Sequence, residues 1–208
     1  MILKVTPTRI TLLNLKKELK VAKKGYKLLK DKRDGLMKKF MATIRETRDL
    51  RENVEEKLGG AFNSYVRASG VLPKKTLDAA FMVPNAKTSL SVKVKTVMSV
   101  AVPQFELKKE GTAFSYGFLH TSGDLDNAIM KFDAVFPDII HLAELEKAAE
   151  SLAEEIERTR RRVSALENTR IPNLDDTIRF ITGRLEEQAR DAIVSTMRVK
   201  AMIVAKEE

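Results

Sequence analysis

The 208-residue chain contains no cysteine and no tryptophan, and aromatic residues make up only 6% of it. The absence of cysteine excludes a disulfide framework and any thiolate metal site. No apolar run approaches the ~20 residues of a membrane-spanning helix. The first ten residues are too short and too interrupted for a signal peptide. We therefore expect a cytosolic or membrane-peripheral protein.

Catalytic motifs are also missing. The two histidines, His120 and His141, have no spacing that pairs them on a metal, and the serines have no histidine–aspartate context. The segment Lys74-Lys75-Thr76 follows a proline and lacks the glycine that a P-loop places before its lysine. We therefore expect a non-enzymatic chain that uses no cofactor and no metal.

An apolar seam with alternating steps of four and three residues runs through the first long segment. Its members are Leu12, Leu15, Leu19, Ala22, Tyr26, Leu29, Arg33, Leu36, Phe40, Thr43, Thr47, Leu50 and Val54. This heptad spacing predicts a coiled-coil helix, which over this span is ~65 Å long at 1.5 Å per residue. Such a helix needs a partner helix of similar length.

A second seam with the same spacing lies at the other end of the chain. It comprises Leu145, Ala149, Leu152, Ile156, Thr159, Val163 and Leu166, and after Pro172 it resumes as Leu174, Ile178, Ile181, Leu185, Ala189, Ala192, Thr196, Val199 and Ile203. The two seams predict an antiparallel coiled coil within one chain. We expect a mainly α protein with an N-terminal helix at 1–69, a middle region at 70–123 and a C-terminal helix at 124–208.

The positive charge is concentrated near the N-terminus. Residues 1–40 hold 13 Lys and Arg against three acidic residues, a net charge of +10, whereas the whole chain carries +9. The remaining residues therefore sum to −1. A basic band of this kind indicates an anionic partner, such as nucleic acid, an anionic membrane or an acidic protein surface. A solvated lysine face is the plainer interpretation.

The middle region changes character. Leu90, Val92 and Val94, then Met98, Val100 and Val102, alternate with polar residues. Period-two alternation predicts two strands of about five residues, forming a β-hairpin at about 88–104 with its turn near Lys95–Val97. An isolated hairpin is only marginally stable, so we expect this one to lean on the coiled coil or on a partner.

Several residues are expected to start, bend or interrupt the helices. Thr6 is the predicted N-cap of the first helix, with Pro7 at its first position. Pro137 is expected to kink or restart the C-terminal helix, and Pro172 to bend or locally unwind it. Gly25 and Gly35 lie off the first seam. Either they leave smooth patches that another chain can approach closely, or the helix merely tolerates them.

Three segments resemble the D subunit of the V-type and A-type rotary ATPases. The N-terminal one begins Pro7-Thr8-Arg9 and continues through the leucines and lysines up to Leu36. The middle one contains Tyr116-Gly117-Phe118 and Leu125-Asp126. The C-terminal one runs from Thr159 to Glu167 and is followed by Ile171-Pro172. Ser164 stands where the family pattern has Asn. The resemblance covers the whole chain and suggests a prokaryotic form.

The resemblance implies a non-catalytic rotor axle. Its paired helices would enter the hexamer of catalytic A and non-catalytic B subunits. Its other end would bear on the small F subunit of the rotor and on the adaptor subunit (C/d type) of the membrane ring. The axle would link ATP hydrolysis or synthesis to H⁺ or Na⁺ transport at the cytoplasmic face of the membrane, with no transmembrane segment of its own and no nucleic-acid partner.

We expect basic side chains and two methionines to contact the hexamer, and the hairpin to contact the region near the F subunit or to modulate turnover. The expected hexamer contacts are Lys16, Lys20, Lys23, Lys27, Arg160, Arg161, Arg162, Met197 and Met202. The alternative for the arginines is that they pair with nearby glutamates on their own helix and form a solvated surface that binds no partner. The alternative functions are a basic nucleic-acid binder, which lacks a recognised binding motif here, and a tethering coiled coil.

Overall fold

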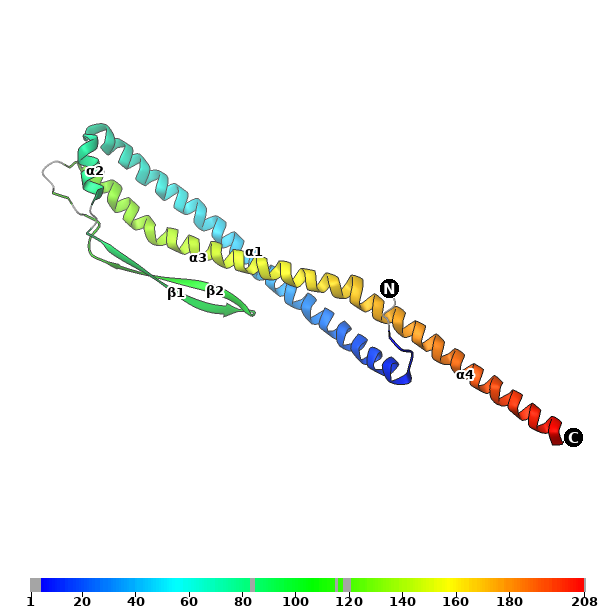
Figure 1. The fold of residues 1–208 in the computed structure, drawn as a ribbon. Helices are drawn as coiled ribbons and strands as arrows, with labels where there is room; N and C mark the ends of the chain where they lie inside the picture. Colours follow the sequence, from blue (N-terminus) through cyan, green and yellow to red (C-terminus); the bar gives the residue numbers. More distant parts are fainter. Residues whose placement is uncertain (1–4, 83–84, 115, 118–120, 208) are drawn as a thin grey trace. The chain divides into compact units, whose positions relative to one another are not determined.

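The computed structural model describes residues 5–82, 85–114, 116–117 and 121–207, so the predictions made for Phe118 and His120 lie outside the described residues. The elements follow in the order α1 (Arg9–Val71), α2 (Lys74–Met82), β1 (Lys87–Val97), β2 (Val100–Glu110), α3 (Gly123–Ala165), η2 (Leu166–Arg170) and α4 (Ile171–Glu207). The expected fold class, mainly α with long terminal helices and a hairpin between them, is confirmed (Figure 1).

The chain forms two compact units, which we describe separately. Unit 1 combines Met1–Asp34 with Glu157–Glu208, and unit 2 is Gly35–Ile156. Every predicted seam position of α1 is buried or half-buried in its unit, whereas Ile44, one place off the seam, is 39% exposed. The heptad spacing therefore identified the inward face of α1 along its length.

The start of α1 differs from the prediction. The helix begins at Arg9, and Thr8 rather than Thr6 caps it. The Thr11 N–H donates to the Thr8 hydroxyl at 3.2 Å, and the Thr8 N–H donates to the Thr11 hydroxyl at 3.1 Å. These reciprocal bonds satisfy backbone donors that the first helical turn leaves without partners.

In unit 1, α1 packs against α4 through one apolar cluster. Its buried members are Leu15, Leu174 and Ile181, and the half-buried residues packed on them include Leu12, Leu19 and Leu185. Arg170 pairs with Glu18, and the Lys23 ammonium lies 3.7 Å from the Asp175 carboxylate. Burial of the leucines and isoleucine supplies most of the stabilisation, because exposed ion pairs contribute only ~0–1 kcal/mol each.

A π-helical turn, η2, separates α3 from α4. The Ile171 N–H bonds to the Leu166 carbonyl, one residue further back than in an α-helix. Pro172 follows, and proline has no N–H to give to the α-helical ladder. The predicted local unwinding near Pro172 is thus confirmed as a change from α to π geometry.

The π-turn also corrects the phase of the seam. A strict repeat places a seam residue seven positions after Leu166, at Asn173, but the buried residue is Leu174 at eight. The π-turn accommodates the one additional residue and returns Leu174 and Ile181 to the inward face, where both are fully buried. Without it, the rest of α4 would be rotated by about 100° on its axis.

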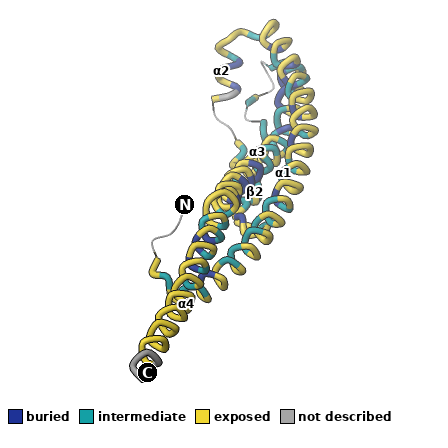
Figure 2. The backbone as a smooth tube through the Cα atoms, turned by 90° about the vertical axis from the view of Figure 1, so that its right-hand side faces the viewer, coloured by how far each residue is buried: buried dark blue, intermediate teal, exposed yellow. Residues whose placement is uncertain are grey.

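In unit 2, α1 and α3 run antiparallel and are joined by polar contacts along their length (Figure 1). Arg51 pairs with Glu146, Lys57 Nζ lies 2.7 Å from Asp138 Oδ2, and Lys131 Nζ donates to Ser64 Oγ at 2.9 Å. The partner numbers fall along α3 as they rise along α1. Figure 2 shows buried positions along the facing sides of the helices.

The far end of unit 2 has its own apolar cluster. Ala68 of α1, Leu77 of α2 and Leu125 of α3 are buried there, with Phe114 and Tyr116 packed against them. Lys74–Met82 forms the short helix α2, and Phe114 and Tyr116 anchor the segment after the hairpin to this cluster. The Tyr116 hydroxyl donates to Asp126 Oδ1 at 2.5 Å.

Pro137 does not restart the helix, because α3 continues through it. Val135, two residues earlier, is only 2% exposed, and Asp138, just after the proline, pairs with Lys57. Packing on both sides of the proline compensates for the lost backbone hydrogen bond.

The hairpin is longer than predicted, and its turn lies further along the chain. Both strands have eleven residues, in a register that pairs Lys87 with Glu110 and Val97 with Val100. The turn residues are Met98 and Ser99, with φ of 50° and 69°, the positive values that a two-residue type I′ turn requires. The prediction missed this turn because neither residue is the Asn or Gly that such turns favour.

Candidate partner-binding surfaces

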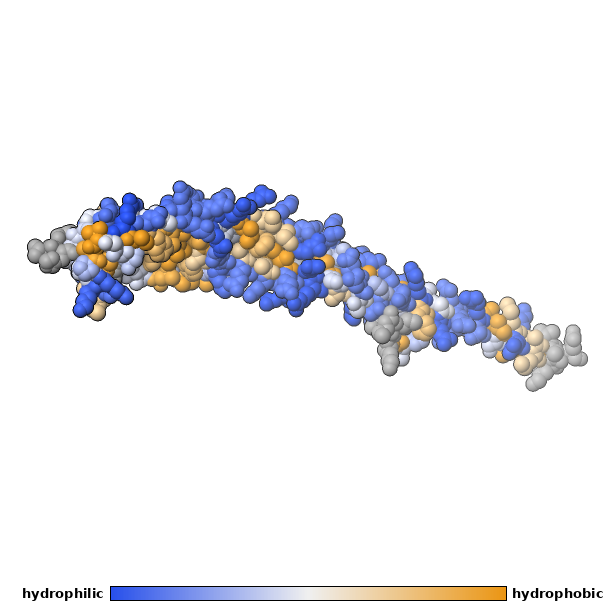
Figure 3. All heavy atoms as spheres, turned by 90° about the horizontal axis from the view of Figure 1, so that it is seen from above, coloured by the Kyte–Doolittle hydropathy of each residue, from blue (hydrophilic) through white to orange (hydrophobic). Residues whose placement is uncertain are grey.

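The C-terminal part of α4 carries an apolar surface that no part of the described chain covers. Its exposed large residues are Ile193, Val194, Met197, Val199, Met202 and Ile203, each 47–65% exposed. In Figure 2 this stretch is uniformly exposed, and Figure 3 shows hydrophobic side chains between hydrophilic ones there. We call these six residues the α4 tip.

The α4 tip corrects one prediction about the seam. The positions from Ala189 to Ile203 were expected to pair with the N-terminal helix, but residues 189–203 are all exposed. The last paired seam position is Leu185, which packs in the cluster around Leu15 near the start of α1. Since α1 begins only at Arg9, it has too few residues to cover the end of α4.

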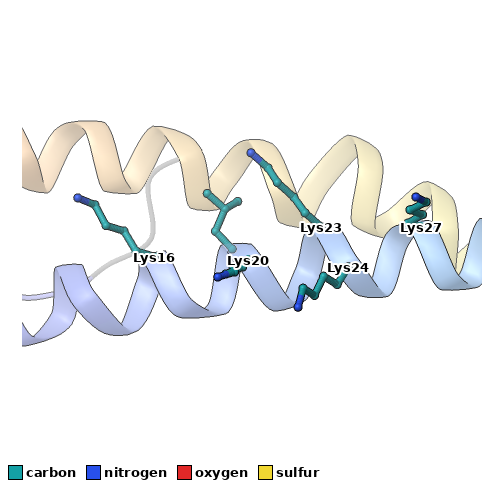
Figure 4. Close-up of a pocket in the computed structure, with 6 residues that line it drawn as sticks. Lys16, Lys20, Lys23, Lys24 and Lys27 are labelled. Atoms are coloured by element: carbon teal, nitrogen blue, oxygen red, sulfur yellow. The ribbon is translucent and has the colours of Figure 1, made fainter.

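The four expected contact lysines follow one another along α1 in the same unit. Lys16, Lys20, Lys23 and Lys27 are exposed and, with Leu19 and Lys24, line a shallow groove of about 400 Å³ (Figure 4). Lys23 reaches toward the neighbouring helix, where it meets Asp175. In the described part of the chain the other three have no ion pair, so their charge is available to an acidic partner.

The expected arginines lie on α3 within unit 1. Arg160, Arg161 and Arg162 are all exposed. Arg161 pairs with Glu157, as the plainer interpretation required, whereas no described acidic residue pairs with Arg160 or Arg162. Arg160 and Arg161 border a shallow depression that also contains Ser164 and Asn168. The plainer interpretation therefore holds for Arg161. Contact of the arginines with the hexamer stays a prediction, for which the guanidinium groups of Arg160 and Arg162 are available.

The hairpin leans on the helices of unit 2, as expected. Val100 is 6% exposed and packs with Leu36, Leu152 and Ile156, and Val102 packs against the same cluster. The Phe105 N–H donates to Glu144 Oε2 on α3 at 3.2 Å, and Lys109 pairs with Asp133. By contrast, Leu90, Val92 and Val94 are 47%, 57% and 69% exposed.

One of the two predicted glycine patches is occupied by the chain itself. A Cβ on Gly35 would lie 2.8 Å from the Met98 methyl group at the hairpin tip, whereas a Cβ on Gly25 would meet nothing within 4 Å. Gly35 therefore makes room for the hairpin. Only Gly25 remains a candidate for close approach by another chain.

None of the helices in the described residues combines the length and apolar character needed to cross a membrane. Within the same residues, no three histidine or acidic side chains are grouped so that they would hold a metal ion.

The long terminal helices, the hairpin between them and the uncovered α4 tip define the class as a mainly α protein with an exposed apolar helix end. The family profile described as the D subunit of ATP synthase matches residues 11–201. The chain is 43% identical over 210 residues to the V-type ATP synthase D subunit of Clostridium botulinum (strain Langeland / NCTC 10281 / Type F), covering 99% of this chain and 97% of the relative. It is 45% identical over 202 residues to the protein of that name from Thermoanaerobacter sp. (strain X514), covering 96% and 97%. The chain belongs to the family of ATP synthase D subunits.

Proposed function

We propose that the chain is the non-catalytic central axle of a V-type or A-type ATPase. In this role it transmits rotation between an A/B hexamer that hydrolyses or makes ATP and a membrane ring that moves H⁺ or Na⁺. The F subunit and the ring adaptor subunit complete its partners. It works at the cytoplasmic face of the membrane as a peripheral component.

The observation that carries the proposal is the uncovered α4 tip in the same unit as the basic band. Six exposed large apolar residues on one helix end are costly to leave in water at about 25 cal/mol per Å² of apolar surface. A surrounding protein collar would cover them. The lysines of α1 and the free arginines of α3 would then face acidic groups of that collar.

The packed pair of helices suits the transmission of torque. In unit 1 the apolar cluster around Leu15 and Ile181, together with the Glu18–Arg170 ion pair, joins the two helices so that they turn as one body. The π-turn and the one-sided basic band make this unit asymmetric about its axis. An asymmetric axle contacts three equivalent catalytic interfaces differently and thus stabilises different states in them.

Removing residues 188–208 tests the proposal. The truncation leaves Leu15, Leu174, Ile181 and Leu185 in place, so unit 1 should keep its helix pair. We expect the truncated chain to lose binding to the A/B hexamer by tenfold or more, or to leave ATP hydrolysis uncoupled from ion transport. Full coupling by the truncated chain would contradict the role of the α4 tip.

The basic contacts are tested by charge reversal. Replacing Arg160 and Arg162 with Glu should weaken assembly and make it less sensitive to added salt, because the attraction that salt screens has been removed. The matched control replaces Lys74 and Lys75 with Glu, which changes the net charge equally in unit 2. If both double variants assemble and hydrolyse ATP like the parent chain, the arginines have no role in binding.

A further inference from the structure

The hairpin exposes the outer edge of β1. Ten of its eleven residues are exposed, and only Val97 beside the turn is half-buried. The outer edge of β2 instead faces α3, through the Phe105 N–H and the Lys109 side chain. The two-stranded sheet therefore has one edge in contact with its own chain and one edge free in the described structure.

The register identifies which backbone groups point outward. In a two-residue hairpin the pair that flanks the turn, Val97 with Val100, is hydrogen-bonded, and the pairs alternate from there. Val94–Pro103 and Val92–Phe105 are then non-hydrogen-bonded pairs. Two facts agree with this assignment: Pro103 has no N–H to donate, and the Phe105 N–H points away from β1, to Glu144. The outward-facing amides of β1 therefore include those of Leu90, Val92 and Val94, at the centre of the strand.

The same three residues carry an exposed apolar face. Residues that pair directly share a face of the sheet, so Leu90, Val92 and Val94 lie with Leu107, Phe105 and Pro103. The last three are half-buried, but the first three are 47–69% exposed. An unbroken free edge with one apolar face and without a proline or bulge can pair with another strand, provided that the charges of the two strands are compatible.

Charge decides what kind of strand fits. Residues 87–110 contain five lysines and two glutamates, a net charge of +3. Lys93 is already paired with Glu106, and no described acidic residue pairs with Lys95. A second copy of β1 would bring lysines against lysines, which is destabilising. An acidic strand would be attracted instead.

We propose that the outer edge of β1 binds an extended acidic strand of another subunit of the complex, which adds to the hairpin as a third strand. Its backbone would bond to Leu90, Val92 and Val94, its apolar side chains would cover those residues, and an acidic side chain would meet Lys95. The inference rests on the proposed function, because it places the partner within the ATPase complex.

Residue-level hydrogen–deuterium exchange on the isolated chain and on the assembled complex tests the proposal. In the isolated chain the amides of Leu90, Val92 and Val94 should exchange fast, whereas the laddered amides of Ser91 and Lys93 should be slower. Assembly should slow the three outward amides by tenfold or more. A complex that assembles and turns over while these amides still exchange fast overturns this inference alone. Failure to assemble overturns the proposed function as well.

Two matched pairs of variants separate edge pairing from side-chain contact. Val92→Pro removes an outward N–H and spares the β1–β2 ladder, as Pro103 does on β2, whereas Val92→Thr keeps the N–H. The proline variant should lose the assembly-dependent protection of Leu90 and Val94, with Lys93 still protected as evidence of a folded hairpin. Lys95→Glu should reduce the protection about tenfold and Lys95→Arg should preserve it. Equal protection within either pair overturns the proposal.

Discussion

Removal of a single residue from the π-turn tests the explanation given for it. If η2 exists because the seam gains one residue between Leu166 and Leu174, deleting Thr169 should restore a seven-residue step and a continuous α-helix. Thr169 is exposed, so its loss removes no packing. The deletion is best made together with Pro172→Ala, since a proline inside the helix costs ~3 kcal/mol.

The magnitude follows from the residues that the π-turn holds inward. Leu174 and Ile181 are fully buried, and burying a Leu or Ile side chain stabilises by ~1.5–3 kcal/mol. Together they favour the π-turn by about 3–6 kcal/mol, more than the hydrogen bond that it displaces. Pro172→Ala alone should therefore keep the π-turn. The variant that combines Pro172→Ala with deletion of Thr169 should have the same free energy of unfolding as Pro172→Ala alone, within about 1 kcal/mol.

Deleting Arg179 provides the control. Arg179 is exposed like Thr169, so its deletion also removes no packing. The deletion nevertheless rotates Ile181 and Leu185 away from the seam, because no π-turn lies between Leu174 and Ile181 that could revert to an α-helix and restore the spacing. This deletion should destabilise unit 1 by about 2–5 kcal/mol, as truncation of a buried Ile or Leu does. Urea unfolding followed by circular dichroism measures both variants. Equal losses for the two deletions would refute the phase explanation.

Three further predictions follow from the packing. Gly25→Ala should stabilise α1 by up to ~1 kcal/mol. Gly35→Ala should stabilise it less, because the new Cβ meets the Met98 side chain, and adding Met98→Ala should restore the full stabilisation. Urea unfolding of the single and double variants measures the coupling between positions 35 and 98. Burial, and then the hydrogen bond to Asp126, raise the pKa of the Tyr116 phenol in the folded chain. The phenol's contribution to the free energy of unfolding is therefore complete below the unfolded-state pKa of ~10, and it is lost as the pH rises toward the folded-state pKa. Tyr116→Phe should flatten this alkaline loss in a pH series of unfolding curves, and an unchanged slope would count against the assignment. Ile181→Ala should destabilise the isolated chain by ~2–5 kcal/mol, but Ile193→Ala, at a position 57% exposed, should leave it unchanged and weaken only hexamer binding, as calorimetry and pull-down can show.

Periodicity predicted the helices well because a long seam repeats one physical requirement many times. Leu15, Leu36 and Val54 were identified as inward-facing from spacing alone, and all three are buried. The step of eight between Leu166 and Leu174 is also visible in the sequence. That step is the signal from which the π-turn could have been predicted.

The uncovered α4 tip required a comparison of the two seams rather than either one alone. Spacing shows that Val199 and Ile203 continue a seam, but not that α1 begins too late to meet them. The hairpin turn was misplaced for a different reason. Met98 and Ser99 adopt the positive φ that the two-residue turn requires, although neither is the Asn or Gly that signals such a turn in a sequence.

The central claim is that this chain rotates within its complex, and a single attached probe tests it most directly. The sequence has no cysteine, so Lys87→Cys at the exposed start of β1 gives one labelling site. With the A/B hexamer fixed to a surface, a bead on this cysteine should turn in one direction when ATP is added and stop when ATP is removed. Steady ATP hydrolysis with a stationary bead would contradict the account.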